Sequence, residues 1–313
     1  MPQRDTLLDL LNDIFSLEGR FLLYDDGYRS WARSYREVAN ASKALAARLR
    51  DSGVAKDDKV LVWSENRPEW IVGLYACLLN GAVAVPVDYR SSAEFVERVA
   101  GITGAKILLC GEEVPGTGSL PAWPLKDIDW PEQSVEFQAA SALRGDLCQI
   151  IFTSGATAEP KGVTITHGNL LANLVPVETE IAKYRRYGRP FRPLRILNLL
   201  PLSHLFGQVM GAFIPPMIPA QVVFMRGFNP REIVRQVKMR RVSVIVGVPM
   251  ILELLRGYVE QNIPGPEPPA KAHWLRRWWI YRKLHRAFGW KFWAFIAGAA
   301  PLAPELEDFW SKR

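Results

Sequence analysis

Residues Ile150 to Val163 read IIFTSGATAEPKGV and hold the most informative pattern of the chain. Apolar residues lead into a run of small and hydroxylated residues around Gly155, and the run ends at Pro160-Lys161-Gly162. Backbone N–H groups, hydroxyls and an ammonium group that converge in one loop are suited to a polyphosphate. The stretch therefore predicts a phosphate-binding loop and favours a nucleotide as its ligand.

The residues around the lysine indicate what kind of loop this is. A Walker P-loop needs Gly, four residues and then Gly-Lys-Ser/Thr entering a helix, but here Pro160 precedes Lys161 and Gly162 follows it. Val163-Thr164-Ile165 then favours a strand. The loop is therefore expected to join two strands rather than to open a helix.

Apolar strands alternate with helical segments on both sides of this loop. Strands are expected at 59–63, 82–87, 106–110, 195–200, 221–225 and 242–246, with helices at 34–51, 68–80, 91 onward, 230–239 and 249–259. This rhythm indicates βαβ units and parallel sheets covered on both faces, hence an α/β fold. The Gly- and Pro-rich segments 111–133 and 262–269 are expected to be surface connections.

Four sequence landmarks follow one another along the chain as they do in the adenylate-forming (AMP-binding) superfamily, which they resemble. This superfamily includes acyl-CoA synthetases, luciferases and peptide-synthetase adenylation domains. The landmarks are the loop at 150–163, residues 62–70 with 80–88, residues 200–207 and residues 298–302. Residues 88–92 and 289–293 look most like bacterial long-chain fatty-acid CoA ligases. The resemblance implies two doubly wound, mostly parallel sheets packed together, as in the large N-terminal domain of acyl-CoA synthetases. The approximate lobes would be 56–190 and 1–55 plus 191–313, with ATP and the acyl chain in the crevice between them.

The resemblance also assigns roles to individual residues. It gives the ATP phosphates to Thr153, Ser154, Gly155, Thr157 and Lys161, a wall beside the acyl carboxylate to His204, and adenine to Gly298, Ala299, Ala300 and Pro301. It requires no general base here, because a fatty-acid carboxylate is already ionised at pH 7. The pattern alone also allows a purely structural role at each place. The loop could be an ordinary polar loop, His204 a core histidine, and residues 298–301 a tight strand-to-helix turn.

Two residues of the loop depart from the family pattern. Ala156 and Ala158 stand where threonine and glycine are common, so that one hydroxyl is lost. A left-handed backbone at Ala158 would cost about 1–2 kcal/mol, and weaker ATP binding is therefore expected.

Several parts of a full ligase are missing from this sequence. The family's Thr-Glu motif, which contacts AMP and Mg²⁺, is not found, nor is the small C-terminal domain whose lysine completes adenylation. The chain is therefore expected to be the N-terminal portion of a ligase that uses ATP, Mg²⁺ and CoA, and to be inactive alone. Alternatives are a remnant that binds only nucleotide or membrane, and an adenylating enzyme for another carboxylate.

Composition limits the remaining possibilities. Cys77, Cys110 and Cys148 each lie in an apolar run, as reduced thiols of a cytoplasmic protein do, and the N-terminus lacks a secretory h-region. The four histidines lack the spacing of a transition-metal site. Residues 196–225 carry no Lys, Arg, Asp or Glu, but prolines divide them. We expect a strand, a loop, a buried helix and a strand there rather than a membrane span.

Residues 271–292 hold seven basic residues and no acid, which matches the net charge of +7 of the whole chain. On a helix, Trp274, Trp278, Tyr281, Leu284 and Phe288 would share one face. This pattern fits a membrane-surface helix at the inner face, which would draw fatty acid from anionic lipid. It fits equally a packed helix with a solvated basic face. Nucleic-acid binding is not favoured, since no recognised module accompanies the charge.

Overall fold

The structure is a computed structural model that describes residues 4–116, 118–153, 160–184, 192–265, 273, 276 and 279–313, without the side chains of residues 153 and 184. Its strands form two six-stranded sheets. Sheet A has the order β12 (Ala294–Ala297), β11 (Val244–Gly247), β9 (Arg195–Asn198), β10 (Gln221–Met225), β1 (Arg20–Asp25) and β2 (Ser30–Ser34). Sheet B has the order β6 (Ala122–Pro124), β5 (Ile107–Cys110), β3 (Lys59–Ser64), β4 (Val83–Asp88), β7 (Leu147–Thr153) and β8 (Lys161–Thr166).

Neighbouring strands run parallel in both sheets, except that β2 is antiparallel to β1 and β8 to β7. The predicted fold of two mostly parallel sheets is therefore confirmed. Residues 59–166 supply the strands of sheet B, and residues 20–34 with 195–297 supply those of sheet A. The lobe boundaries themselves stay a prediction.

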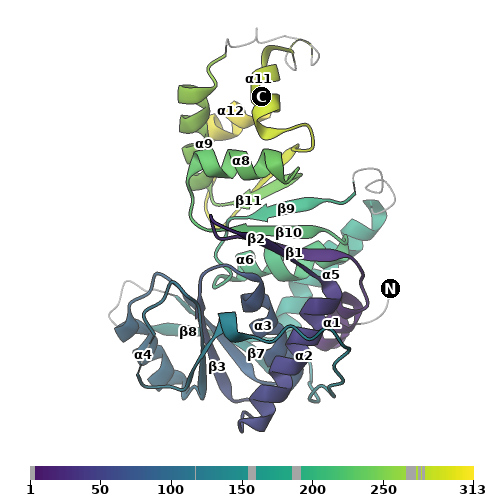
Figure 1. Ribbon diagram of the computed structural model, residues 1–313, viewed down its shortest axis with the longest axis vertical. Coiled ribbons are helices and arrows are strands. Elements are labelled where there is room, and N and C mark those ends of the chain that lie inside the picture. The colour runs from purple at the N-terminus through teal and green to yellow at the C-terminus, as the bar shows by residue number, and fades with distance from the viewer. Residues whose placement is uncertain are drawn as a thin grey trace.

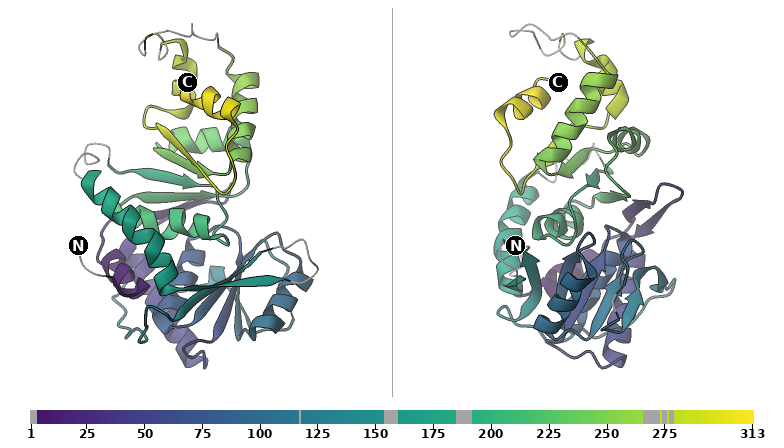
Figure 2. Two further views of the ribbon diagram at one scale, coloured as in Figure 1. Left: turned by 180° about the vertical axis from the view of Figure 1, so that it is seen from behind. Right: turned by 90° about the vertical axis from the view of Figure 1, so that its left-hand side faces the viewer.

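Helices separate the two sheets and cover their outer faces (Figures 1 and 2). The largest core cluster joins the inner faces of both sheets to α1 (Leu7–Phe15), α2 (Tyr35–Asp51), α3 (Pro68–Asn80) and α5 (His167–Tyr184). The outer face of sheet A packs against α8 (Pro230–Met239), α9 (Pro249–Asn262), α11 (Arg282–Phe288) and α12 (Pro304–Ser311). The outer face of sheet B packs against α4 (Ala93–Thr103). The central strands β3, β4, β10 and β11 are thus buried on both faces, as their continuous apolar runs require.

Local sequence explains where the predicted helices begin and end. The Ser34 side chain accepts from the Glu37 N–H, and the Glu37 carboxylate accepts from the Ser34 N–H, which is the capping box expected at the start of α2. Pro68 opens α3, and Gly81 ends it in a left-handed conformation with φ of 70°. Helix α8 also has the predicted bounds.

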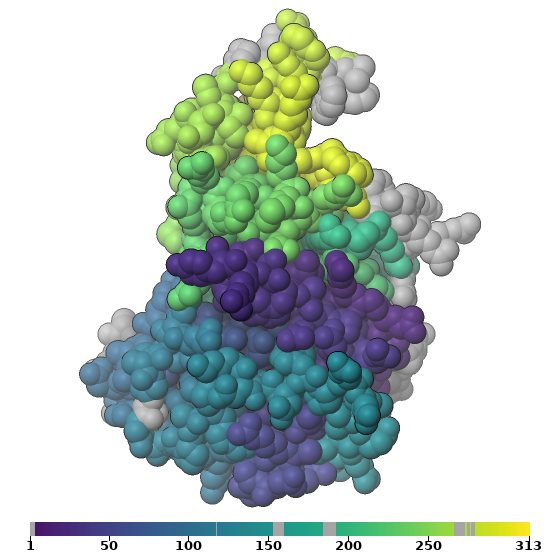
Figure 3. All heavy atoms as spheres, in the orientation of Figure 1, coloured from purple at the N-terminus to yellow at the C-terminus, as the bar shows by residue number. Residues whose placement is uncertain are grey.

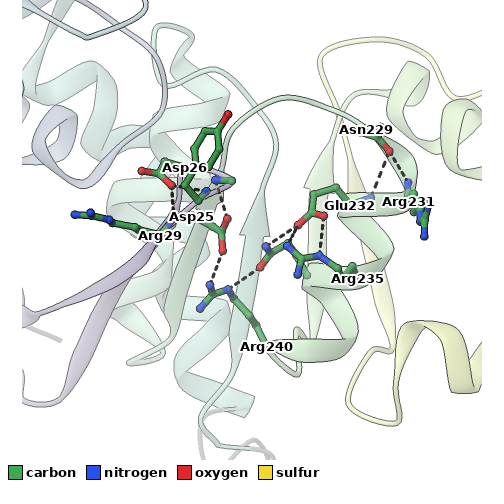
Figure 4. Close-up of polar contacts among 11 residues, drawn as sticks. Asp25, Asp26, Arg29, Asn229, Arg231, Glu232, Arg235 and Arg240 are labelled. Atoms are coloured by element: carbon green, nitrogen blue, oxygen red, sulfur yellow. Dashed lines mark hydrogen bonds and ion pairs between the residues drawn. The ribbon is translucent and has the colours of Figure 1, made fainter.

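The amino-terminal residues, purple in Figure 3, lie in the middle of the molecule. They stand between the residues of sheet B below and the rest of sheet A with its helices above. Arg240, which follows α8, ties that helix to β1. Its Nη2 lies 2.7 Å from Asp25 Oδ2, and its Nε donates to Gln236 (Figure 4). Asn229 caps the first turn of the same helix by accepting from the Arg231 and Glu232 N–H groups. The Arg240 contact thus fixes the end of α8 on sheet A, and the Asn229 cap stabilises its first turn.

Two segments differ from their predicted form. Residues 111–133 were expected to be a surface connection, but they contain strand β6 and a short 3₁₀ helix, Leu125–Asp127. Strand β6 pairs in parallel with β5, so part of this segment belongs to sheet B.

Helix α11 lies in the basic segment, part of which is outside the described residues. Helix α11 covers only Arg282–Phe288, and Tyr281, Leu284 and Phe288 are buried against sheet A. These three side chains are therefore packed and are not available to a membrane surface. Trp274 and Trp278 lie outside the described residues.

The charge-free stretch 196–225 forms β9, α6 (Leu205–Gln208), a π-helical turn at 209–213, α7 (Ile214–Met217) and β10. This matches the expected strand, loop, buried helix and strand. Within the described part of the chain, no helix has the length and apolar character needed to cross a membrane.

A buried histidine gives the fold a predicted dependence on pH. His167 Nδ1 accepts from the Leu7 N–H at 3.1 Å, and burial lowers the pKa of His167 below 6.5. The unfolded chain therefore binds a proton that the folded chain does not, and stability falls as the pH drops below 6.5. We expect His167→Gln to reduce the pH slope of the free energy of unfolding. The reduction is at most about 1.4 kcal/mol per pH unit, which corresponds to one proton.

Urea unfolding between about pH 8 and about pH 5.5 checks this expectation. The parent chain, measured under the same conditions, gives the reference slope. An unchanged slope in His167→Gln would show that this buried imidazole does not link proton uptake to unfolding.

Candidate functional site

The carboxyl ends of the parallel strands of both sheets meet in one region. Ligands of open α/β sheets bind outside this edge. A small cavity lies there, between residues at or just beyond the ends of strands from both sheets. Its lining consists of Tyr24, Glu65, Asn66, Tyr89, Glu113, Asn198, Leu199, Pro201, Met225, Arg226, Gly227 and Phe228. The region is therefore the first candidate for a functional site.

Polar contacts join the two sheets across this region. Asn66, after β3, donates to the Leu200 carbonyl at 2.7 Å and accepts from the Leu202 N–H at 2.8 Å, beyond β9. Arg226, after β10, forms an ion pair with Glu113, after β5. Because each pair takes one partner from each sheet, the contacts hold the two carboxyl edges against each other.

A buried cluster of charges supports the same region from sheet B. Arg67 donates to Glu65 at 3.0 Å and to Glu69 at 2.8 Å, and all three side chains are buried. Burial opposes the charge of Arg67, but Glu69, Glu65 and Glu112 outweigh that effect and raise its pKa. A Cβ at Gly111 would lie 2.1 Å from Glu65 Oε2, so glycine allows the loop after β5 to approach this carboxylate.

His204 lies at this edge as the residue that precedes α6. Its side chain is 58% exposed, and Nε2 lies 3.7 Å from Asp88 Oδ2 at the end of β4. Arg90 donates two hydrogen bonds to the same carboxylate, from Nε at 3.0 Å and from Nη2 at 2.8 Å. Burial alone would raise the pKa of Asp88, but His204 and Arg90 outweigh it and hold the pKa well below 3.8. His204 is therefore an exposed side chain beside an anion and not a core histidine.

The segment predicted to contact adenine lies against the His204 loop. A Cβ on Gly298 would come within 2.4 Å of the Phe206 ring, so the glycine backbone packs directly on that ring. Gly298 follows β12, and its N–H donates to the Gly247 carbonyl at 3.3 Å. Two landmarks that are far apart in sequence are thus in direct contact.

Ala299, Ala300 and Pro301 are exposed, which leaves their backbone open to a ligand. Ala299 has φ of 66°, the left-handed region that glycine adopts without cost. Ala299 is therefore a strained alanine in this chain.

The predicted phosphate loop joins two strands, as expected. Thr153 ends β7 and pairs with Lys161, the first residue of β8, and the Lys161 side chain is exposed. Ser154, Gly155, Ala156, Thr157 and Ala158 lie outside the described residues, as does the Thr153 side chain. Since β7 runs parallel to β4, Thr153 and Asp88 lie at the same edge of sheet B.

Sequence reasoning did not single out the partners of His204 or the cross-sheet pairs. Asp88 and Arg226 lie directly at the carboxyl ends of strands that the pattern had located. Glu113 lies a short distance beyond the end of another such strand. A signal therefore existed, namely a charged residue after the carboxyl end of an apolar strand. Their pairing was not readable, because it depends on how the two sheets face each other.

A tight approach in the His204 loop leads to a stability prediction. A Cβ on Gly207 would lie 2.0 Å from the Pro201 carbonyl oxygen, with no flexible side chain to move aside. Gly207→Ala should therefore destabilise the fold by about 1–3 kcal/mol. Gly257→Ala is the control, since nothing lies within 4 Å of its Cβ. In helix α9 that change should stabilise by about 0.5–1 kcal/mol.

Urea unfolding of the two glycine variants provides the measurement. A Gly207→Ala chain as stable as the parent would contradict the close packing of residues 201–207.

The strained alanine leads to a second stability prediction. Ala299→Gly should relieve about 1–2 kcal/mol of left-handed strain, less about 0.4–1 kcal/mol of added entropy in the unfolded chain. A net gain of about 1 kcal/mol is expected. Ala300→Gly, at a position without left-handed φ, should instead lose about 0.4–1 kcal/mol. If both variants lose stability in thermal unfolding, Ala299 is not strained.

Comparisons with known proteins agree on one family. The AMP-binding enzyme family matches residues 19–313. A long-chain-fatty-acid–CoA ligase of Mycobacterium bovis is 28% identical over 325 residues, 88% of this chain and 52% of the ligase. A feruloyl-CoA synthase of Amycolatopsis sp is 28% identical over 235 residues, 72% of this chain and 46% of the synthase. The chain spans about half the length of these relatives.

Other similarities are shorter or concern the fold. A D-alanine–D-alanyl carrier protein ligase of Bacillus mycoides is 34% identical over 145 residues, 44% of this chain and 29% of the ligase. The structure of a fatty acyl-adenylate ligase from L. pneumophila, in complex with acyl adenylate and pyrophosphate, matches with a TM-score of 0.74 and 21% identity. The match covers 99% of this chain and 52% of that one. The N-terminal domain of FACL13 from Mycobacterium tuberculosis matches with a TM-score of 0.70 and 21% identity, over 98% of this chain and 73% of that one.

Proposed function

The chain belongs to the AMP-binding enzyme family, and on this basis we propose that it forms the N-terminal portion of an ATP-dependent long-chain fatty-acid CoA ligase. The observation that carries the proposal is the contact between Gly298 and Phe206. It puts the candidate adenine segment beside His204, at the edge where strands of both sheets end. Adenine and an acyl carboxylate held there would be neighbours, as adenylation requires.

The proposed reaction has two steps. The fatty-acid carboxylate attacks the α-phosphorus of ATP, an acyl-oxygen–phosphorus bond forms, and pyrophosphate leaves with the electron pair of the broken bond. The thiolate of CoA then attacks the acyl carbonyl, and AMP leaves. Lys161 would place a compact positive charge on the leaving pyrophosphate, where negative charge grows in the transition state. His204 would act as a wall beside the carboxylate.

Mg²⁺ is part of this reaction in the family. The described residues contain no group of three His, Cys, Asp or Glu side chains arranged to hold a metal ion. Nucleotide-bound Mg²⁺ is usually held by one or two carboxylates together with the phosphates, and neither step is assigned to it in this chain. The proposed location is the cytoplasm, since thiols in apolar runs suit a reducing compartment.

The acyl substrate has a second candidate. The similarity to long-chain ligases favours a long acyl chain. The similarity to a feruloyl-CoA synthase and a D-alanine ligase favours another carboxylate. A chain that only binds nucleotide is the alternative without catalysis.

Pyrophosphate release separates these functions. We would measure it with ATP and palmitate, ferulate or D-alanine, first with the 313-residue chain and then with the longest open reading frame that contains it. Release with palmitate supports the proposal. Release with ferulate or D-alanine alone would mean that the substrate is another carboxylate. ATP binding without pyrophosphate release from either protein would favour the binding-only alternative.

Lys161→Ala tests the phosphate loop directly. Loss of one hydrogen bond to a charged phosphate should weaken ATP binding by about 1.5–3 kcal/mol, roughly 10- to 150-fold. Folding stability should change by less than about 0.5 kcal/mol, because Lys161 is exposed. Lys106→Ala, at an exposed lysine before β5, is the matched control. Equal affinities of the parent and Lys161→Ala in calorimetric titration would remove Lys161 from the nucleotide site.

A further inference from the structure

The amino-terminal edge of sheet A carries a group of apolar and positively charged side chains, all exposed except the half-buried Lys291. We call it the amino-edge patch. It consists of Lys238, Met239 and Arg241 at the end of α8, with Trp290, Lys291 and Trp293 in the turn before β12. Trp290 is 80% exposed, Trp293 65% and Met239 54%. Large apolar side chains so exposed are costly in water and often mark an interaction site.

Packing makes this patch one continuous surface. A Cβ added to Gly289 would lie 3.5 Å from the Lys238 Cα. The turn after α11 therefore packs on the end of α8. The Trp293 N–H donates to the Ser243 carbonyl at 3.1 Å, and β11 and β12 pair from Val244 and Ala294 onward. Two segments about fifty residues apart are thus joined where both strands begin.

The charge of the patch is not neutralised within the described part of the chain. Lys238, Arg241 and Lys291 form no ion pair there, whereas the neighbouring Arg240 is paired with Asp25 (Figure 4). Lys291 Nζ lies 5.5 Å from the centre of the Trp290 ring. Glu307 of α12 borders one side, because it lines a groove with Trp293. Three cations against one carboxylate leave the patch positive.

A half-buried arginine lies in the same positive field. Arg195 begins β9 at this edge, and burial, followed by the charges of Arg241, Arg20 and Arg240, lowers its pKa. Cations therefore accumulate along the amino-terminal edge of sheet A, beyond the six residues of the patch.

We propose that the amino-edge patch binds the surface of an anionic lipid bilayer. The two indole rings would lie among the headgroups, where tryptophan is enriched, and the three cations would meet lipid phosphates. Nucleic acid fits less well, since Met239 offers no stacking face and Lys291 lies over one indole ring. The surface differs from the face of α11 that the sequence pattern had suggested, because Tyr281, Leu284 and Phe288 of that face are buried.

The position of the patch limits its role. The candidate site lies at the carboxyl edge of sheet A, and a four-residue strand such as β11 spans about 13 Å. The patch is therefore an anchor that holds the protein beside the bilayer, and it is not an entrance to the site. Binding needs no catalysis, so the experiment below is independent of the pyrophosphate assay.

Sedimentation with vesicles tests the proposal on the 313-residue chain. Vesicles of phosphatidylcholine alone are compared with vesicles of phosphatidylcholine and phosphatidylglycerol, at low and high salt. We expect binding to the anionic vesicles, weakened by salt. Neutralising Lys238, Arg241 and Lys291 together to Gln should lower the partition coefficient about five-fold per cation, roughly 100-fold in all. Trp290→Ala with Trp293→Ala should weaken binding at every salt concentration, because apolar contacts are not screened.

Matched controls separate the patch from total charge and exposed apolar area. Arg36→Gln, Lys106→Gln and Lys126→Gln remove three exposed cations elsewhere, and Tyr28→Ala with Leu143→Ala removes two exposed apolar side chains. These control variants should bind vesicles as the parent does. Thermal unfolding confirms that each variant is folded, which is expected for exposed positions.

Three outcomes overturn the proposal. One is equal vesicle binding by the parent and both patch variants. A second is binding of a single-stranded oligonucleotide, lost in the patch variants, without binding to vesicles. A third is a dimer in sedimentation velocity that Trp290→Ala with Trp293→Ala dissociates, again without binding to vesicles, since the patch would then be an interface between two copies.

Discussion

The two sheets bury their inner faces against the same helices, and this shared core fixes where every other feature lies. Its largest cluster takes residues from α1, α2, α3 and α5 and from strands of both sheets. Parallel strands have all their carboxyl ends on one edge, so the core also decides which edges face each other. The candidate site is a consequence of that orientation, since each of its parts follows a strand end.

Charged groups at this junction depend on the same core. Arg67 is buried between Glu65 and Glu69, where removal of one partner would leave an uncompensated charge. Asp88, by contrast, lies at the end of β4, where Arg90 and His204 both approach it. The first cluster holds the chain in place, whereas the second keeps an anion next to an exposed imidazole. Rigid support and open chemistry thus occur on neighbouring strands.

Sequence patterns located most strands with a continuous apolar run, although the buried strand β1 was not among them, and they missed the partly exposed strands β2 and β6. In β3, Val60 and Val62 pack inward while Leu61 and Trp63 pack outward, which gives a continuous apolar run. Strand β2, SWARS, has no such run, and β6 has three residues that end in proline, so neither stands out. Similarly, the apolar face of α11 was visible in the sequence, but its partner was not. Whether such a face meets sheet A or a bilayer depends on tertiary packing.

The ring of Phe206 and the backbone of Gly298 occupy adjoining space, with no room for a methyl group between them. These two positions are therefore not free to vary independently. A lineage that acquires a side chain at 298 would have to shrink residue 206 first, and a smaller residue at 206 would leave a hole that a side chain at 298 could fill. An aligned set of relatives should carry this trace as correlated substitution between two sites about ninety residues apart.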